Sequence, residues 1–141
     1  MSLVENIEHE RAKEAWNCVN CVNSQKEDEF KKEYRSIVMK LPTMIITNGL
    51  GQTLAFLKSK GKGEKNKPEE KLYRDIENWL NKRVHWTVTG KLELIEKIIA
   101  LPSDKFRYVT AETLSFLSWM RRFADAVLPK EDTVLPKEGK K

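Results

Sequence analysis

The amino-acid sequence predicts an all-α fold, a compact single-domain bundle of about five or six helices. Apolar residues recur three and four positions apart over most of the chain, which is the spacing of one helix face. No segment alternates apolar and polar residues strongly enough to indicate a β-strand. The 141 residues suit one domain, which we expect at residues 1–128, followed by a flexible polar C-terminal tail at 129–141.

The first part of the chain predicts three helices. The first covers residues 3–24, where valine, isoleucine and alanine share one face. The second begins near Lys26 with an acidic first turn, which suits the helix dipole. It is expected to end before Pro42, because a residue that precedes proline is steered away from helical geometry. Pro42 then opens a third helix at 43–59, which is apolar on most faces and therefore belongs at the centre of the bundle or under a partner.

Two glycines in the middle of this third helix are its most informative feature. Each costs about 1 kcal/mol relative to alanine inside a helix. We expect such residues where a neighbouring backbone comes close or where the helix bends. The sequence thus predicts a packing motif made of Pro42, Asn48, Gly49, Gly51 and Gln52.

A lysine-rich loop separates the third helix from the fourth. Gly61 and Gly63 end the third helix, and residues 60–67 form the loop. Pro68 suits the first turn of a fourth helix, which is expected to reach about residue 84. A turn is predicted at 87–90, where Thr-Val-Thr-Gly follows.

Two further helices complete the predicted bundle. A short one at 91–101 is expected to direct Leu92, Ile95, Ile98 and Ile99 inward and to stop at Pro102. The last helix runs from residue 103 or 105 to residue 128. Its apolar stripe is Phe106, Val109, Thr113, Phe116, Leu117, Met120, Ala124 and Val127.

Composition limits the function classes. The chain is 40% hydrophobic, which is too apolar for disorder throughout, and its net charge is +5. Much of the basic excess lies between Lys58 and Lys67, where five lysines stand against one glutamate. Such a segment is typical either of a nucleic-acid contact or of a solvated loop, and charge alone leaves both open. No apolar run approaches the ~20 residues of a membrane span, so we expect a cytoplasmic protein with no membrane partner.

The cysteines and histidines do not indicate a metal or redox site. Cys18 and Cys21 form a C-x-x-C inside a helix, without the strand–helix context of a redox motif. Only His9 and His85 could complete a zinc site, and they lie in unrelated contexts. We expect two ordinary reduced cysteines and no cofactor.

The sequence shows no catalytic constellation. No nucleophile is paired with a base, and no carboxylate lies in an apolar stretch that would raise its pKa. Asp125 comes nearest and is predicted to lie on a helix surface. The Gly49-x-Gly51 pair lacks the third glycine and the preceding strand of a dinucleotide fingerprint. A helix-turn-helix with its turn at residues 48–51 is disfavoured, because the recognition helix would present leucine and phenylalanine to DNA.

Contact with RNA phosphates is plausible through basic residues on helix faces. Such contacts do not depend on base sequence and weaken with salt. Trp79, Phe106 and Phe116 occupy core positions rather than stacking positions. The candidate RNA-contact residues are Lys31, Lys32, Arg35, Lys40, Lys58, Lys60, Arg74, Arg121 and Arg122.

Several motifs resemble one known family. The central motifs are Glu33-Tyr34-x-Ser36, Leu41-Pro42-x-Met44-Ile45, Asn48-Gly49-Leu50-Gly51-Gln52 and Leu54-Ala55-Phe56. Supporting motifs are Arg11-Ala12-Lys13 followed by Trp16, and Trp119-Met120-Arg121-Arg122-Phe123-Ala124. With these motifs the chain resembles the small α-helical subunit of the Cmr-type (type III-B) CRISPR ribonucleoprotein effector complex. The tail beyond Leu128 matches nothing in that pattern.

The resemblance implies a helical bundle without catalytic activity of its own. Its partners would be the other Cmr subunits, especially the backbone subunit, the guide and target RNA, and further copies of the chain in a minor filament. The family has no catalytic motif to transfer, so the resemblance implies no catalytic, metal or cofactor residue. Two alternatives stay open: a metal-dependent ribonuclease, and a small stand-alone nucleic-acid-binding protein.

Overall fold

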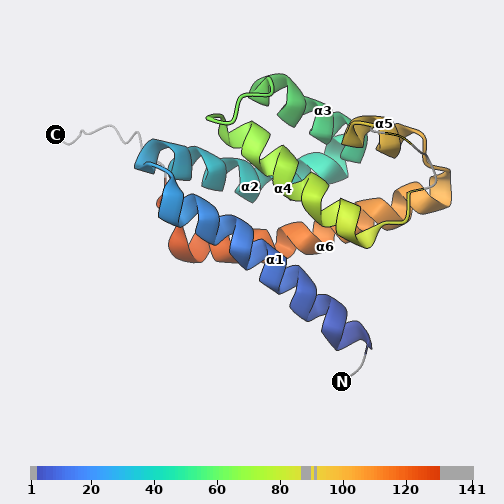
Figure 1. Cartoon of the computed structure of the whole chain (residues 1–141), viewed down its shortest axis with the longest axis horizontal. Helices are drawn as coiled ribbons and strands as arrows, with labels where there is room; N and C mark the ends of the chain where they lie inside the picture. The colour runs from blue at the N-terminus through green and yellow to red at the C-terminus, as the bar shows by residue number, and fades with distance from the viewer. Residues whose placement is uncertain (1–2, 87–89, 91, 131–141) are drawn as a thin grey trace.

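Six helices form within residues 3–86, 90 and 92–130, which are the residues that the computed structural model describes (Figure 1). No strand occurs in that part of the chain, so the all-α prediction is confirmed. The helices are α1 (Leu3–Gln25), α2 (Asp28–Asn48), α3 (Leu50–Gly61), α4 (Pro68–Arg83), α5 (Leu94–Ile99) and α6 (Ser103–Val127).

The longest helix, α6, organises the bundle. It packs against both α1 and α2, while α3 and α4 pack on each other and α4 also contacts α2. Figure 1 shows α1 crossing α6 and extending beyond it at the N-terminal end, with α5 beside α3. All six helices contribute to one apolar core, whose largest fully buried side chains are Tyr34, Tyr73 and Phe116. Because α2 packs on α6, the outward-facing residues of these two helices can line one surface.

The predicted helix break at Pro42 is wrong, because α2 continues through this residue to Asn48. Pro42 cannot donate a backbone hydrogen bond to the carbonyl of Val38, which normally makes proline costly inside a helix. Leu41 and Ile45, on either side of Pro42, are 0% and 3% exposed. Because both sides of the proline are anchored in the core, burial outweighs the local preference and the helix persists.

The break lies instead at Gly49, which separates α2 from α3. Gly49 has φ 91° and ψ 159°, and its N–H donates to the carbonyl of Ile45 at 2.7 Å. The prediction that glycine permits a bend is therefore confirmed, but its placement inside one helix is wrong. No atom of another element lies within 4 Å of a Cβ built on Gly49 or Gly51, so neither marks a close backbone approach. Asn48 and Gln52 are exposed, so within this chain the segment forms a helix junction, and packing of the motif against a partner stays a prediction.

Replacing Gly49 with alanine should destabilise the protein, because almost only glycine adopts this backbone conformation. We expect Gly49→Ala to lower the free energy of unfolding by about 1–2 kcal/mol, all of it from backbone strain since the surrounding space is open. Urea unfolding followed by circular dichroism measures the change. Gly63→Ala is a comparison at a second glycine of positive φ, in an exposed loop. Unchanged stability of Gly49→Ala would show that the junction adopts another conformation.

The remaining elements agree with the sequence except in α5. The observed α1, α4 and α6 match the predicted helices to within two residues at each end. In α5 the buried residues are Leu94 and Ile98, whereas Ile99, predicted to point inward, is 72% exposed. Leu94 and Ile98 lie four residues apart and so share the face that meets α3. Residues 87–89 of the predicted turn and 131–141 of the predicted tail lie outside the described residues.

Candidate nucleic-acid interface

Asp75 is a buried carboxylate that was not predicted from the sequence. It is 5% exposed, and it accepts hydrogen bonds from the Tyr34 hydroxyl at 2.5 Å and from Lys71 Nζ at 2.6 Å. Burial raises the pKa of Asp75, and the hydrogen bonds from Lys71 and Tyr34 only partly oppose that effect. The prediction that no carboxylate has a pKa raised by apolar surroundings is therefore wrong. Asp75 joins α4 to α2 and serves the fold.

Glu112 is another buried carboxylate, beside Asp75 and Glu70, and it connects three helices. Arg11 of α1 donates to it twice, from Nε at 2.8 Å and from Nη2 at 2.9 Å, and Trp79 Nε1 of α4 donates at 3.0 Å. Burial alone would raise the pKa of Glu112, but the hydrogen bonds from Arg11 and Trp79 outweigh it and hold that pKa below its usual range. A carboxylate whose partners are all structural is a poor general acid or base.

The thiols are free and unequal. Cys18 is buried and Cys21 half-buried. Burial raises the pKa of the Cys18 thiol, which keeps it protonated and unreactive. In the described part of the chain, no group of three or more histidine, cysteine, aspartate or glutamate side chains is placed to hold a metal ion.

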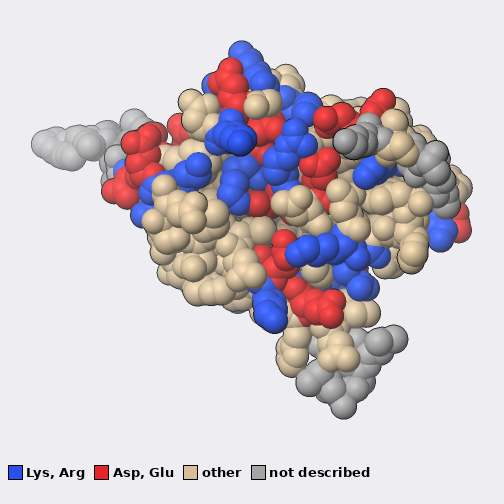
Figure 2. Space-filling model, viewed as in Figure 1, with Lys and Arg blue, Asp and Glu red and all other residues tan. Residues whose placement is uncertain are grey.

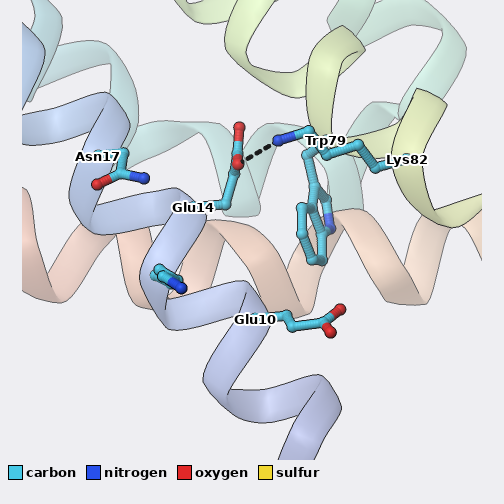
Figure 3. A pocket seen from close by; sticks show the side chains of 6 residues that line it. Glu10, Glu14, Asn17, Trp79 and Lys82 are labelled. Atoms are coloured by element: carbon cyan, nitrogen blue, oxygen red, sulfur yellow. Dashed lines mark hydrogen bonds and ion pairs between the residues drawn. The ribbon is translucent and has the colours of Figure 1, made fainter.

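A cleft of ≈ 320 Å³ lies between α1 and α4 (Figure 3). Glu14 of α1 and Lys82 of α4 form an ion pair of 2.7 Å across it, and the Trp79 ring forms part of its wall. Glu10 and Lys13 add one charge of each sign. Because acidic and basic groups balance, the cleft does not select an anion.

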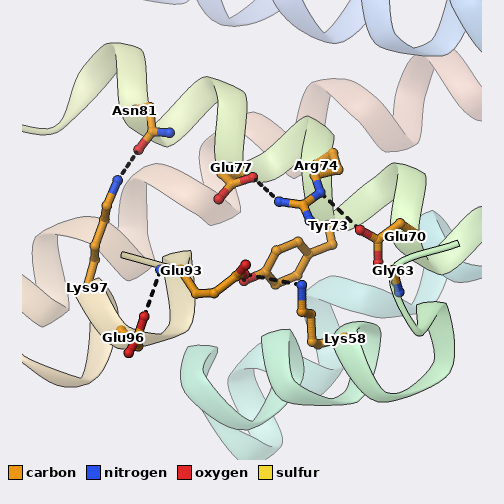
Figure 4. A network of polar contacts seen from close by, with 10 residues as sticks. All are labelled: Lys58, Gly63, Glu70, Tyr73, Arg74, Glu77, Asn81, Glu93, Glu96 and Lys97. Atoms are coloured by element: carbon orange, nitrogen blue, oxygen red, sulfur yellow. Dashed lines mark hydrogen bonds and ion pairs between the residues drawn. The ribbon is translucent and has the colours of Figure 1, made fainter. Parts of the chain in front are cut away.

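Two of the predicted RNA-contact residues, Lys58 and Arg74, flank the ring of Tyr73 at 5.0 Å and 5.5 Å (Figure 4). Both are already engaged by carboxylates. The pairs are Lys58–Glu93 at 3.2 Å, Arg74–Glu70 at 2.9 Å and Arg74–Glu77 at 2.7 Å. Three carboxylates face two cations here, and Figure 2 shows acidic and basic side chains interspersed over α3 and α4. This network holds α3, α4 and the start of α5 together more readily than it binds phosphate.

The surface where α2 meets α6 presents a different balance of charge. We define the arginine depression as an open hollow of ≈ 350 Å³ lined by Met39, Ser118, Arg121, Arg122 and Asp125. Arg121 and Arg122 are exposed and have no ion pair within the described residues. The lining residues of α6 share one face of the helix, because each pair is three residues apart: Ser118 with Arg121, and Arg122 with Asp125. Guanidinium groups bind phosphate through planar pairs of N–H donors, so this hollow suits an RNA backbone.

Arg35 is not among the residues that line the arginine depression, but it is paired with one of them, Asp125. It lies on α2, its side chain is 12% exposed, and Nη2 donates to Asp125 Oδ1. Asp125 is 58% exposed, as expected for a helix-surface residue. Two arginines thus line the depression with one carboxylate, and that carboxylate is already paired with a third arginine.

The other predicted residues are not brought into the arginine depression. Lys31 lies 3.8 Å from Asp28 on its own helix, and the half-buried Lys32 also has an interaction of its own. Lys40 and Lys60 are exposed on α2 and α3. RNA contact by any of these residues stays a prediction.

An aromatic cluster lies beside Arg122 and was not predicted from the sequence. Trp16 of α1 meets Phe123 of α6 edge to face at 5.2 Å, and Phe123 meets Trp119 at 5.7 Å. Trp16 is 41% exposed, whereas Trp79 is 2% exposed and packs inside as predicted. The signal in the sequence is weak, because Trp16 and Phe123 are brought together only by the crossing of α1 and α6.

The chain contains the turn that a helix-turn-helix motif would need, but α3 does not suit the role of the recognition helix. The chain does turn at Gly49, and α3 follows directly. However, Leu50, Leu54 and Leu57 of α3 are completely buried. A recognition helix needs an exposed polar face near its start, so α3 serves the core.

None of the helices in the described residues is long and apolar enough to cross a membrane.

Comparison with known proteins assigns the family. Residues 7–127 match the model of the family described as CRISPR-associated protein (Cas_Cmr5). A protein of Thermus thermophilus named CRISPR system Cmr subunit Cmr5 is 31% identical over 100 residues, which cover 71% of this chain and 79% of that protein. The crystal structure of a CRISPR-associated Cmr5 family protein from T. thermophilus superposes with a TM-score of 0.69 at 26% identity, covering 87% of this chain and 98% of that one. The chain therefore belongs to the Cmr5 family of CRISPR-associated proteins.

Proposed function

We propose that this chain is a non-catalytic small subunit of a Cmr-type (type III-B) CRISPR ribonucleoprotein effector complex. Copies of it stack into the minor filament beside the backbone subunits and help to hold the target RNA for antiviral defence. The match of residues 7–127 to the Cmr5 family carries the proposal. The name of the T. thermophilus relative, which describes that protein as a Cmr subunit, supports it.

The arginine depression supports a role in holding RNA. Arg121 and Arg122 are exposed, and Asp125, which is paired with Arg35, is the one carboxylate that lines the depression with them. Phosphate contacts of this kind do not depend on base sequence, which suits a subunit that must accept any target. One small surface makes few contacts, so we expect weak binding by a single copy and strong binding by a filament that repeats the surface.

The buried carboxylates favour this role over the ribonuclease alternative. A metal-dependent nuclease needs carboxylates that converge on a shared cation. Asp75 and Glu112 lie in separate networks and are each bonded to a side chain of a neighbouring helix. The third buried carboxylate, Glu70, accepts hydrogen bonds from Arg74 and from the Gly63 N–H. These carboxylates hold the bundle, and we assign cleavage of RNA to other subunits.

Reversing the charge of the arginine depression tests the RNA-binding part of the proposal. In complexes assembled with Arg121→Glu/Arg122→Glu, the affinity for target RNA should fall by about tenfold at low salt, because attraction to phosphate is replaced by repulsion. The slope of log affinity against log salt should become shallower by about 0.7 for each phosphate of a single strand that is no longer bound. Assembly itself should be retained, which native mass spectrometry of the complex measures.

Lys105→Glu/Arg107→Glu is the matched control. Both residues are exposed on α6, toward its other end, and the change in net charge is the same. We expect this variant to bind target RNA much as the wild type does. Equal losses in the two variants would reduce the effect to overall charge and remove the arginine depression from the proposal.

A further inference from the structure

Asp125 stands at an unexpected place in the arginine depression. It lies in the last turn of α6, where a negative charge opposes the helix dipole. Its position within one turn of Arg121 and Arg122 puts a carboxylate among the groups best placed to meet phosphate. A negative charge at this position therefore does not stabilise α6. Asp125 is instead engaged directly by its ion pair with Arg35 of α2.

Of the guanidinium donors of Arg35, the one paired with Asp125 is the one that a ligand of Asp125's surface could compete for. Its Nη2 donates to Asp125, while its buried Nε has no hydrogen-bond partner in the described structure. Only 12% of the Arg35 side chain is exposed, so a ligand in the depression could reach only a small part of it. Guanidinium groups bind carboxylate and phosphate oxygens with the same planar donors. An RNA phosphate that enters the depression would thus compete with Asp125 for the same group.

We propose that Asp125 acts as an internal competitor of RNA phosphate, occupying Arg35 and lowering the affinity of the arginine depression for RNA. The inference rests on the proposed function and adds a residue that tunes it. A weak single surface keeps free subunits off other RNA in the cell, while repetition along a filament restores binding to a target that is already paired with the guide. Asp125 is thereby a residue that sets the affinity for RNA and not merely a surface charge.

The isosteric change Asp125→Asn tests this directly on the isolated full-length chain. The probe is a labelled, short single-stranded oligouridylate, and fluorescence anisotropy gives its affinity over a salt series that starts well below physiological ionic strength. We expect affinity to rise by about two- to fivefold at low salt, the size of one exposed ionic contact. The salt slope should steepen by about 0.7, because one more phosphate is bound. A purely structural role for Asp125 predicts no steeper slope.

Two further variants separate the mechanism from overall charge. Asp104→Asn makes the same charge change at an exposed position at the start of α6. It should leave both affinity and slope near the wild-type values. In the double variant Arg35→Gln/Asp125→Asn the gain should disappear, since the released donor is missing. Circular dichroism confirms that each variant is folded.

The outcomes are distinct from those of the proposed function. Equal or weaker RNA binding by Asp125→Asn overturns the inference, even where charge reversal at Arg121 and Arg122 weakens binding and so upholds the RNA-holding role. An equal gain in Asp104→Asn also overturns it, because overall charge then suffices. No binding of the oligouridylate by wild type and Asp125→Asn at any salt overturns it as well. A gain that persists in the double variant contradicts the role of Arg35.

Discussion

Replacing Glu112 with alanine is expected to lower the free energy of unfolding by about 2–4 kcal/mol, because it breaks a buried ionic network that joins three helices. Arg11 of α1 would lose two hydrogen bonds and Trp79 of α4 would lose one. The Arg11 side chain is 16% exposed, so water can reach part of its guanidinium and limit the loss. Urea unfolding measures the difference. Glu10→Ala, at an exposed position on α1, should cost little, and a similar small cost for Glu112→Ala would contradict the role given to the network.

The same network should make stability depend on pH. The pKa of Glu112 is lower in the folded protein than its usual value, because the hydrogen bonds from Arg11 and Trp79 outweigh the opposite effect of burial. The stabilisation is therefore present above the ordinary glutamate pKa of about 4.3 and is lost as the pH falls through the lower folded value. The stability gap between wild type and Glu112→Gln should consequently narrow on acidification, which urea unfolding over a series of pH values measures.

Gly61→Ala is expected to destabilise the protein by about 2–3 kcal/mol, although alanine normally favours a helix over glycine. A Cβ at Gly61 would lie 2.8 Å from the backbone nitrogen and 2.9 Å from the Cα of Glu70. These atoms belong to the first turn of α4, so the clash forces the end of α3 away from α4 rather than moving a flexible side chain. Thermal and urea unfolding measure the loss.

Gly51→Ala is the matched control, because Gly51 also lies in α3 but has open space where a Cβ would point. That variant should be as stable as the wild type or more stable by about 0.5–1 kcal/mol, from the better helix propensity of alanine. Equal behaviour of the two variants would mean that the α3–α4 contact relaxes freely.

The sequence predicts the helices well but misplaces one junction. Apolar spacing and local end signals, such as Pro68 at the start of α4, are properties of neighbouring residues and can be read directly. The predicted helix break at Pro42 is wrong, because the helix continues where Leu41 and Ile45 are buried. Their burial is set by the positions of other helices. The close approach was likewise expected at Gly49 or Gly51 and occurs at Gly61, where the position of α4 decides.

At the candidate site, too, features of neighbouring residues can be predicted from the sequence, whereas contacts between distant residues cannot. The sequence identifies exposed arginines such as Arg121 but cannot pair Arg35 with Asp125, which is 90 residues away. Arg11 and Glu112 are separated by 101 residues, so their network is equally invisible in the sequence. Asp75 could have been found, because it sits between Leu72 and Ile76 on the apolar face of a single helix.

Native mass spectrometry of the tagged chain, purified gently from its own host, tests the central claim most directly. We predict recovery of a large particle that contains several larger proteins, a short guide RNA and more than one copy of this chain. Recovery as a lone monomer, or as a simple homo-oligomer without RNA, would contradict a role as a stacked subunit of an RNA-guided complex.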